Sequence, residues 1–317
     1  MISHDEHRLD VEVVGIEEVA VGVRAVHLAQ VDGADLPPWT PGAHIDVHLG
    51  PLTRQYSLCG RTDDLATWRI GVLLEPESRG GSQFVHGLER GDKLAVVGPR
   101  NNFILQPAAE YLFVAGGIGI TPMLPMIAAV EARGLPWRLL YGGRRRASMA
   151  FLPELESYGD RVLISPQDEG GHPDIAGALA RCGPGVHVYC CGPEPLLAAV
   201  EERTQALPAG STHVERFRPR AADPDAAADA AFEVVLERSG VTVQVPADEP
   251  IVDALLRAGV AVDTSCREGI CGSCETRVLG GVPLHRDSLL SDEEQAANDT
   301  MMVCVGRSRT PRLVLDL

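Results

Sequence analysis

Four cysteines near the C-terminus have the spacing of a metal-ligating set. They are Cys266, Cys271, Cys274 and Cys304. The first three follow the pattern C-x4-C-x2-C, and 29 residues separate the third from the fourth. Four thiolates at this spacing hold the two irons of a plant-type 2Fe-2S cluster. Gly269 and Gly272 suit such a loop, because N–H groups can turn toward the sulfides where no Cβ intervenes. Buried free thiols or disulfides are the alternative, but three cysteines within nine residues are too regular for core packing.

A second candidate site lies in the N-terminal third. The run Arg54-Gln55-Tyr56-Ser57-Leu58 has strand character, and a flat ring could lie against its aromatic face with polar groups at the ring edges. A strand whose Arg and Tyr face the solvent explains the run equally well when it is taken alone.

A glycine-containing turn further along the chain suits a phosphate. Arg79, Gly80, Gly81 and Ser82 precede and open a short helical segment. Glycines at a helix start expose N–H groups and the positive end of the helix dipole. An ordinary glycine turn is the alternative.

A third candidate site combines two turns, each of which follows an apolar strand and opens a helix. The first contains Gly116, Gly117, Gly119, Thr121 and Pro122. Its glycines allow the backbone to approach a pyrophosphate at the helix N-terminus. Proline stands where G-x-G-x-x-G has its third glycine, and it suits an early helical position.

The second of these turns is formed by Cys191, Gly192 and Pro193. A single cysteine at a strand end is more often a small buried apolar residue than a reactive group, so Cys191 depends on its neighbours for a functional interpretation.

The elements that must position these residues follow from the apolar pattern. Six short runs between turn residues predict a small antiparallel β-barrel. They span residues 9–16, 23–29, 44–49, 54–58, 68–74 and 93–97.

From residue 111 onward, strand-like runs alternate with helical segments, which predicts an α/β doubly wound parallel sheet. The strands are expected at 111–115, 137–141, 161–165, 187–191 and 212–217, and the helices at 122–133, 149–157, 174–181 and 194–206.

The C-terminal region predicts a separate small α+β unit. Residues 219–231 have no periodic apolar face and are rich in Ala, Asp and Pro, which is typical of a linker. Strands at 232–238 and 241–245 flank Ser239-Gly240, a two-residue hairpin signal, and a helix is expected at 251–258. The expected boundaries are therefore 1–105, 106–218, a linker at 219–231, and 232–317.

Composition limits the function classes. The 317 residues carry a formal charge of −16, which argues against binding nucleic acid or an anionic membrane. No apolar run approaches the ~18 residues that span a bilayer. The acidic, polar N-terminus is not typical of a signal peptide, so a cytoplasmic location is expected. Nothing indicates a coiled coil, and a monomer is expected.

The order of these motifs along the chain resembles the phthalate dioxygenase reductase family, and the resemblance covers essentially the whole length. It implies a multi-domain fold: an antiparallel β-barrel that binds FMN, an α/β doubly wound domain that binds NADH or NADPH, and a plant-type 2Fe-2S ferredoxin domain of the β-grasp type. The compact turn at 79–82 favours FMN over FAD.

The resemblance also implies residue roles. Arg54, Tyr56, Ser57 and Leu58 would lie near the flavin ring and ribityl chain, and Arg79, Gly80, Gly81 and Ser82 near its phosphate. The nucleotide would lie on Gly116, Gly117, Gly119, Thr121, Pro122, Cys191, Gly192 and Pro193. Thr121 and Cys191 would flank the hydride path. Phe217 resembles the aromatic residue beside the flavin, although a core position is an equal alternative.

By the same resemblance, a nicotinamide would give a hydride to FMN, and single electrons would pass through the cluster to a terminal oxygenase, either a Rieske-type enzyme or a haem monooxygenase. A free-standing flavin or quinone reductase and a redox-sensing iron–sulfur flavoprotein are the alternatives. Arg144, Arg145 and Arg146 follow the second strand of the parallel sheet, where they could pair with a 2′-phosphate or form a solvated loop. The choice between NADH and NADPH stays open.

Overall fold

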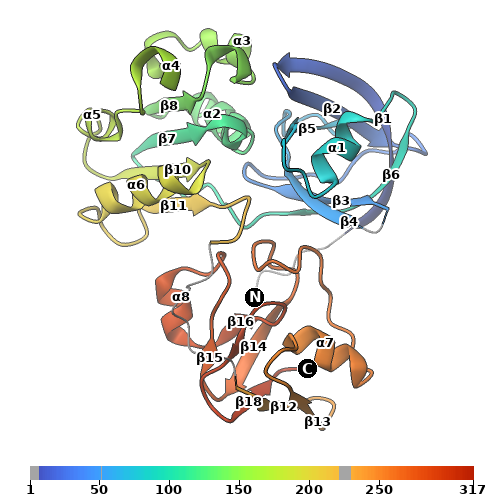
Figure 1. The fold of residues 1–317 in the computed structure, drawn as a ribbon. Helices are drawn as coiled ribbons and strands as arrows, with labels where there is room; N and C mark the ends of the chain where they lie inside the picture. The colour runs from blue at the N-terminus through green and yellow to red at the C-terminus, as the bar shows by residue number, and fades with distance from the viewer. Residues whose placement is uncertain (1–6, 51, 221–229) are drawn as a thin grey trace. The chain divides into compact units, whose positions relative to one another are not determined.

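The computed structural model describes residues 7–50, 52–220 and 230–317. The chain divides into two compact units, Met1–Glu215 and Arg216–Leu317 (Figure 1). The predicted linker falls mostly outside the described residues. In the described ranges, no helix is long and apolar enough to cross a membrane.

The first unit begins with the antiparallel barrel that the sequence predicts. Its strands pair in the order β4-β3-β6-β1-β2-β5, and a bridge between Leu58 and Ile70 joins the end of β4 to β5. Alternate apolar side chains of these strands fill the interior, with Trp68 fully buried. The elements are β1 (His7–Ala20), β2 (Val23–Gln30), β3 (His44–Leu49), β4 (Leu52–Ser57), β5 (Trp68–Leu73), α1 (Gly81–His86) and β6 (Lys93–Arg100).

The same unit continues with a parallel five-stranded sheet in the order β11-β10-β7-β8-β9. The order reverses between β7 and β10, which is where ligands bind in doubly wound folds. Its strands are β7 (Glu110–Gly116), β8 (Trp137–Gly143), β9 (Val162–Pro166), β10 (Val186–Cys191) and β11 (Thr212–Glu215). Its helices are η1 (Gly117–Ile120), α2 (Met123–Ala132), η2 (Arg146–Ser148), α3 (Leu152–Glu156), η3 (Gly159–Arg161), α4 (Gln167–Gly170), α5 (Ile175–Leu179) and α6 (Glu194–Thr204).

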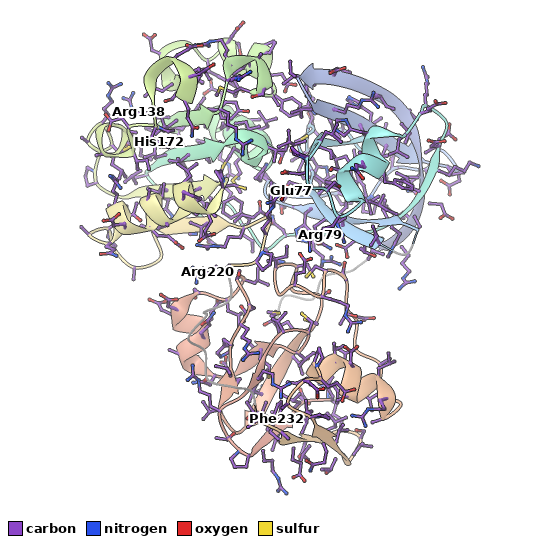
Figure 2. All side chains as sticks on the ribbon, in the orientation of Figure 1. Glu77, Arg79, Arg138, His172, Arg220 and Phe232 are labelled. Atoms are coloured by element: carbon purple, nitrogen blue, oxygen red, sulfur yellow. The ribbon has the colours of Figure 1, made fainter. Side chains whose placement is uncertain are left out.

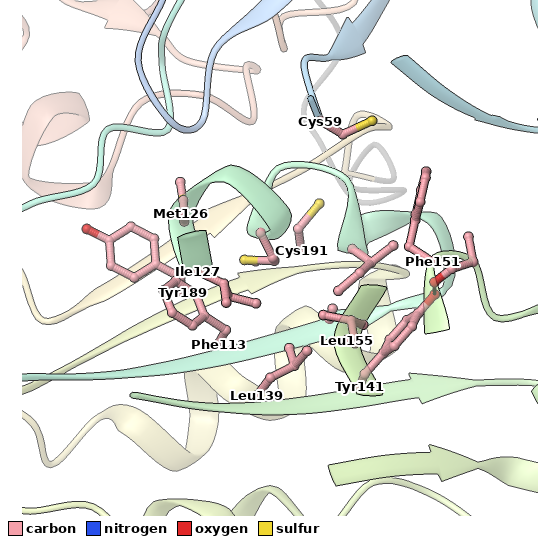
Figure 3. Close-up of a cluster of buried hydrophobic side chains, with 14 of the residues drawn as sticks. Cys59, Phe113, Met126, Ile127, Leu139, Tyr141, Phe151, Leu155, Tyr189 and Cys191 are labelled. Atoms are coloured by element: carbon pink, nitrogen blue, oxygen red, sulfur yellow. Dashed lines mark hydrogen bonds between the residues drawn. The ribbon is translucent and has the colours of Figure 1, made fainter. Parts of the chain in front are cut away.

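The barrel and the parallel sheet share one apolar cluster (Figure 3). Cys59 enters it from the barrel, whereas Phe113, Tyr141, Phe151 and Cys191 come from the parallel sheet and its connections. The two predicted domains of this unit are therefore packed against each other through a shared apolar core.

The second unit has the β-grasp organisation expected of a ferredoxin. Its main sheet has the order β13-β12-β18-β14-β16, and β15 pairs with β17. The elements are β12 (Phe232–Leu236), β13 (Val241–Val245), α7 (Ile251–Arg257), β14 (Glu275–Gly280), β15 (Pro283–Leu284), α8 (Asp292–Ala297), β16 (Thr300–Met302), β17 (Arg307–Ser308) and β18 (Arg312–Leu315).

Two local predictions differ from the structure. The helix expected at 149–157 begins only at Leu152, because Phe151 adopts a left-handed conformation with φ 62° and ψ 19°. The hairpin after β12 has a four-residue connection, not a two-residue one, because Leu236 pairs directly with Val241. Gly240 closes this turn with φ 67°.

Candidate functional site

The cluster loop runs between α7 and β14 in the second unit. The sulfur-bearing residues Cys271, Cys274 and Cys304 are buried, and Cys266 is half-buried. Gly269 has φ 70°, and a Cβ at this position would lie 2.7 Å from Val305 Cγ2. Only glycine allows the loop to turn here at so close an approach.

The four thiols form two neighbouring pairs, Cys266 with Cys271 and Cys274 with Cys304. A hydrogen bond from Cys266 lowers the pKa of the Cys271 thiol to about 6. Cys274 lowers the pKa of the Cys304 thiol in the same way. The same hydrogen bonds, together with burial, raise the pKa of the partner thiols Cys266 and Cys274. Each pair therefore favours one thiolate, the form in which cysteine ligates iron.

Backbone and hydroxyl donors of the loop point at these sulfurs. The Glu268 N–H lies 3.2 Å from Cys266 Sγ, Ser273 Oγ lies 3.2 Å from Cys271 Sγ, and the Gly269 N–H bonds to Cys304. Such hydrogen bonds stabilise thiolate ligands of iron–sulfur clusters.

The flavin candidates on and directly after β4 divide into half-buried and buried groups. Arg54 lies on β4 and donates from Nη2 to the backbone oxygen of Arg79, at 3.2 Å. Tyr56 is partly buried, which raises its pKa to about 12. Ser57 is buried, and Leu58 is fully enclosed in the barrel core. Leu58 can therefore offer a flavin only its backbone, which bonds to Ala43 O at 2.9 Å.

The two parts of the predicted flavin site lie together. Arg79 precedes α1 (Figure 2), and Gly80 before the helix has φ 93°. A Cβ on Gly81 would lie 2.7 Å from Arg54 Cγ, so glycine is what allows the arginine to cross this turn. Ser82 Oγ bonds to the Glu75 N–H and to Ser78 Oγ, which fixes the turn from within.

The two predicted nucleotide turns also meet, at the point where the strand order of the parallel sheet reverses. A Cβ on Gly119 would lie 2.2 Å from Cys191 O, and one on Gly192 would lie 3.0 Å from Gly116 Cα. Gly117 has φ 56° and faces open space. Pro122 and Pro193 precede the first residues of α2 and α6.

The two residues predicted to flank the hydride path are both buried. Thr121 Oγ1 donates to Ile118 O at 2.9 Å, which leaves its methyl group directed at Gly71 of β5. Cys191 is fully enclosed, and its thiol donates to the carboxyl group of Glu215 at the end of β11. Burial raises the pKa of Cys191 well above its ordinary value.

Glu215 is a site residue that the sequence reasoning missed. Burial raises the pKa of its carboxyl group to about 8, and Oε2 has no hydrogen-bond partner among the described residues. A carboxyl group at the end of a parallel strand, directly beyond an apolar segment, is the signal that could have found it. Phe217 lies two residues further on, at the start of the second unit, and its place beside the flavin remains a prediction.

The three arginines after β8 are exposed. Arg146 forms an ion pair with Glu169 at 3.0 Å, and Arg144 O accepts from the Asp168 N–H. Both acidic groups come from α4, which the sequence did not predict. The loop therefore presents basic and acidic groups together. This mixture of charge favours neither NADH nor NADPH, which differ by the 2′-phosphate.

Comparison with known proteins agrees with this arrangement. Residues 234–308 match the model of the 2Fe-2S iron–sulfur cluster binding domain. The chain is 46% identical over 286 residues to phenoxybenzoate dioxygenase subunit beta of Ectopseudomonas oleovorans, with 89% of each chain covered. A solved structure of phthalate dioxygenase reductase is 36% identical, covers 98% of both chains and has a TM-score of 0.70. The chain belongs to the phthalate dioxygenase reductase family.

This member of the phthalate dioxygenase reductase family is also similar to part of a larger protein. An intact type IV self-sufficient cytochrome P450 monooxygenase is 43% identical with a TM-score of 0.91, and the match covers 98% of this chain. It covers only 41% of the P450 chain.

Membership of the family makes the protein an oxygenase reductase, an electron-transfer oxidoreductase that uses FMN, a 2Fe-2S cluster and NADH or NADPH. The donor sets fit these groups. Each iron of a 2Fe-2S cluster takes two cysteine ligands, and the four cysteines lie in two pairs. Among the described residues, no group of three or more His, Cys, Asp or Glu could hold a single metal ion. Gly81 and Gly119 keep open the backbone cradles that a Cβ would fill.

Replacing Arg54 with alanine should reduce the FMN content of the purified protein. The guanidinium group is the positive charge that lies across the Gly81 turn, and its loss should weaken FMN binding by roughly 1.5–3 kcal/mol, the range of a charged hydrogen bond. Flavin released on denaturation measures the content. Arg8→Ala, at an exposed position of β1, is the matched control. Equal flavin content in both variants would contradict the assignment of Arg54.

Glu215 should make stability depend on pH. Its carboxyl group keeps its proton in the folded state up to a pKa of about 8, whereas an unfolded glutamate releases the proton near its ordinary pKa of 4.5. Because the folded state then binds more protons, stability should fall as pH rises between these values, by up to about 1.4 kcal/mol per pH unit. Thermal unfolding of the wild type and of Glu215→Gln from pH 5 to 8 measures this, and the variant should lose less stability. Parallel curves would contradict the raised pKa.

Proposed function

We propose that this protein is the reductase component of an oxygenase system and delivers single electrons to a terminal oxygenase, either a Rieske-type enzyme or a haem monooxygenase. One observation carries the proposal. A glycine turn that meets Cys191 and a set of four cysteines, three of them buried, occur in one chain that aligns over nearly all of its length with phthalate dioxygenase reductase. When they are bound, the nicotinamide supplies a hydride, FMN separates the two electrons, and the cluster carries them one at a time.

The protein's own contribution begins with placement of the nucleotide. Gly116, Gly117 and Gly119 leave the turn after β7 free of side chains, so that backbone N–H groups can face a pyrophosphate. Gly192 and Pro193 form the opposite wall of the turn. Thr121 and Cys191, both shielded from water, flank the nicotinamide end in this proposal.

The carboxyl group of Glu215 holds the Cys191 side chain in one orientation. Because burial keeps this carboxyl neutral up to a pH near 8, it places no negative charge in the path of a hydride. On the barrel, the turn formed by Arg79, Gly80, Gly81 and Ser82 holds the phosphate of FMN in this proposal. Arg54, Tyr56, Ser57 and the backbone of Leu58 line its ring and ribityl chain, and Arg54 also lies across the Gly81 turn.

The cluster loop is the exit for electrons. The second unit carries 14 acidic residues and eight arginines over residues 232–317, a net charge of −6 before histidine is counted. This surplus favours docking to a basic face of the oxygenase, mainly through a faster association rate.

We extend the proposal to the location of the protein and to its assembly state. None of the eight cysteines forms a disulfide, and the four outside the cluster loop are free thiols, as in a reducing compartment; we place the protein in the cytoplasm. We propose a monomer.

Titration with oxygenase components tests the proposal. The reductase, NADH or NADPH, and a purified Rieske-type or haem oxygenase are mixed, and reduction of the oxygenase is followed by its absorbance. Electron delivery that saturates with oxygenase concentration and weakens as salt rises supports the proposal. Rapid nucleotide oxidation with free quinones, together with no transfer to any oxygenase, would instead support the free-standing quinone reductase. A cluster that is reduced but gives up no electrons to either acceptor would support the redox sensor.

A further inference from the structure

The barrel strand β5 touches the nucleotide turn directly, within the first unit. A Cβ added at Gly71 would lie 2.8 Å from Thr121 Cγ2 and 3.1 Å from Phe151 Cζ. Any larger residue at this point would push the two elements apart. The contact of the Gly71 backbone with the side chains of Thr121 and Phe151 therefore fixes the separation between the barrel and the end of the nucleotide turn.

One guanidinium group fastens this contact. Arg69 lies two residues before Gly71, on the same face of β5. Its Nε and Nη2 donate to Cys59 O at 3.2 and 2.6 Å, and its Nη1 and Nη2 donate to the two carboxylate oxygens of Glu154 at 2.6 and 2.9 Å. The guanidinium carbon also lies 4.9 Å from the centre of the Phe151 ring.

These partners belong to different parts of the site. Cys59 lies two residues beyond the end of β4, the strand that carries the flavin candidates, and the Arg69 backbone oxygen also accepts from the Cys59 N–H at 2.8 Å. Glu154 and Phe151 belong to α3 and the residue before it, in the nucleotide-binding part. The Arg69 side chain is 16% exposed and that of Glu154 is 46% exposed, so the pair is anchored on the buried guanidinium, and its bidentate geometry fixes the orientation of the two groups.

Phe151 gives independent evidence that the junction is under constraint. Its backbone is left-handed at φ 62°, a conformation that is unfavourable for a large side chain. The ring is buried against Gly71 and beneath Arg69. Such a conformation persists where the surrounding structure determines it, and strained residues of this kind gather at functional sites.

We propose that Arg69 is a positioning residue for hydride transfer. It locks the segment after the flavin strand onto Phe151 and Glu154, and so holds Thr121 at a set distance from the barrel. This inference rests on the proposed function, because it assumes that the hydride crosses between these two parts. A misplacement of about 1 Å between reacting groups can lower a rate on the order of 100-fold, so a small loosening should be measurable.

Anaerobic stopped-flow measurement of flavin reduction tests the role of Arg69 in catalysis. In Arg69→Ala, the rate at saturating nucleotide should fall about 10-fold or more, with FMN content and nucleotide affinity unchanged. Arg69→Lys should recover only part of the rate, since an ammonium cannot make both bidentate contacts. Arg61→Ala removes an exposed barrel ion pair with Asp63 and should leave the rate unchanged.

Hydrogen–deuterium exchange of the flavin-free protein supplies a readout that does not depend on turnover. In Arg69→Ala, amide exchange should accelerate in α3 and in residues 58–60, and should stay unchanged in the cluster loop. Faster exchange with a reduction rate within about twofold of wild type would overturn the proposal, because Arg69 would then be only structural.

Two further outcomes bear on the role of Arg69: a variant that does not fold, and a wild type that the nucleotide does not reduce. If Arg69→Ala does not fold, Glu154→Gln and Arg69→Lys take its place, and unchanged rates in both overturn the proposal. If the wild type itself is not reduced by NADH or NADPH, the proposed function fails and Arg69 has no hydride transfer to position, so this inference is overturned as well. A slow rate confined to the Arg69 variants affects neither the proposed electron exit nor the cluster assignment.

Discussion

Replacing Cys274 with serine should remove electron exit while flavin chemistry continues. Cys274 is buried and paired with Cys304, so its loss leaves one iron with a single thiolate. Cytochrome c reduction should fall by more than ~100-fold, because even the loss of an outer-shell partner of a metal ligand can cost 10- to 100-fold. Ferricyanide reduction by NADH or NADPH, which needs only the flavin, should stay within about twofold of wild type.

The control for this experiment is a cysteine outside the loop. Cys182 is half-buried and bonds only weakly, from Sγ to Ala178 O at 3.5 Å. Cys182→Ser should leave both activities and the visible spectrum of the cluster unchanged. Equal loss of cytochrome c and ferricyanide activity in Cys274→Ser would contradict the division between flavin and cluster.

Gly119→Ala should disable the nucleotide site. The added Cβ would lie 2.2 Å from the oxygen and 2.5 Å from the carbon of the Cys191 carbonyl group, and this backbone cannot rotate away as a side chain would. Relieving the clash should separate the two turns and destabilise the fold by about 1–3 kcal/mol. Stopped-flow reduction should show a rate or an apparent nucleotide affinity that is about 10-fold or more lower.

Gly170→Ala is the matched control, since a Cβ there meets no atom within 4 Å and φ is not in the left-handed region. Chemical reduction of the Gly119→Ala protein by dithionite should still reduce both flavin and cluster, which shows that they are present. Normal reduction by the nucleotide in Gly119→Ala would contradict the placement of the site at this turn.

The fold was predictable because its signals are local. The alternation of apolar residues gave the six barrel strands, and the alternation of strands with helices gave the parallel sheet. The two glycine turns were visible as motifs, and their apposition follows from the strand order of a doubly wound sheet. The cysteine spacing by itself predicted a cluster, because ligation imposes a distance that the sequence must keep.

Other features depend on tertiary contacts and left no local signal. The raised pKa of Glu215 comes from burial beside Cys191, which the sequence does not show. Phe151 looks like an ordinary residue of a helical segment until its ring is seen against Gly71. Arg69 is one of 27 arginines in the chain, and nothing in its immediate neighbours distinguishes it.

The central claim is that electrons enter at the nucleotide turn and leave at the four-cysteine loop. Anaerobic mixing of the wild-type protein with excess NADH or NADPH tests it most directly, with flavin and cluster absorbance followed in time and the reduced cluster identified by electron paramagnetic resonance. The flavin should bleach first and the cluster should be reduced after it, on a timescale fast enough for turnover. A flavin that is reduced while the cluster stays oxidised on that timescale would contradict it.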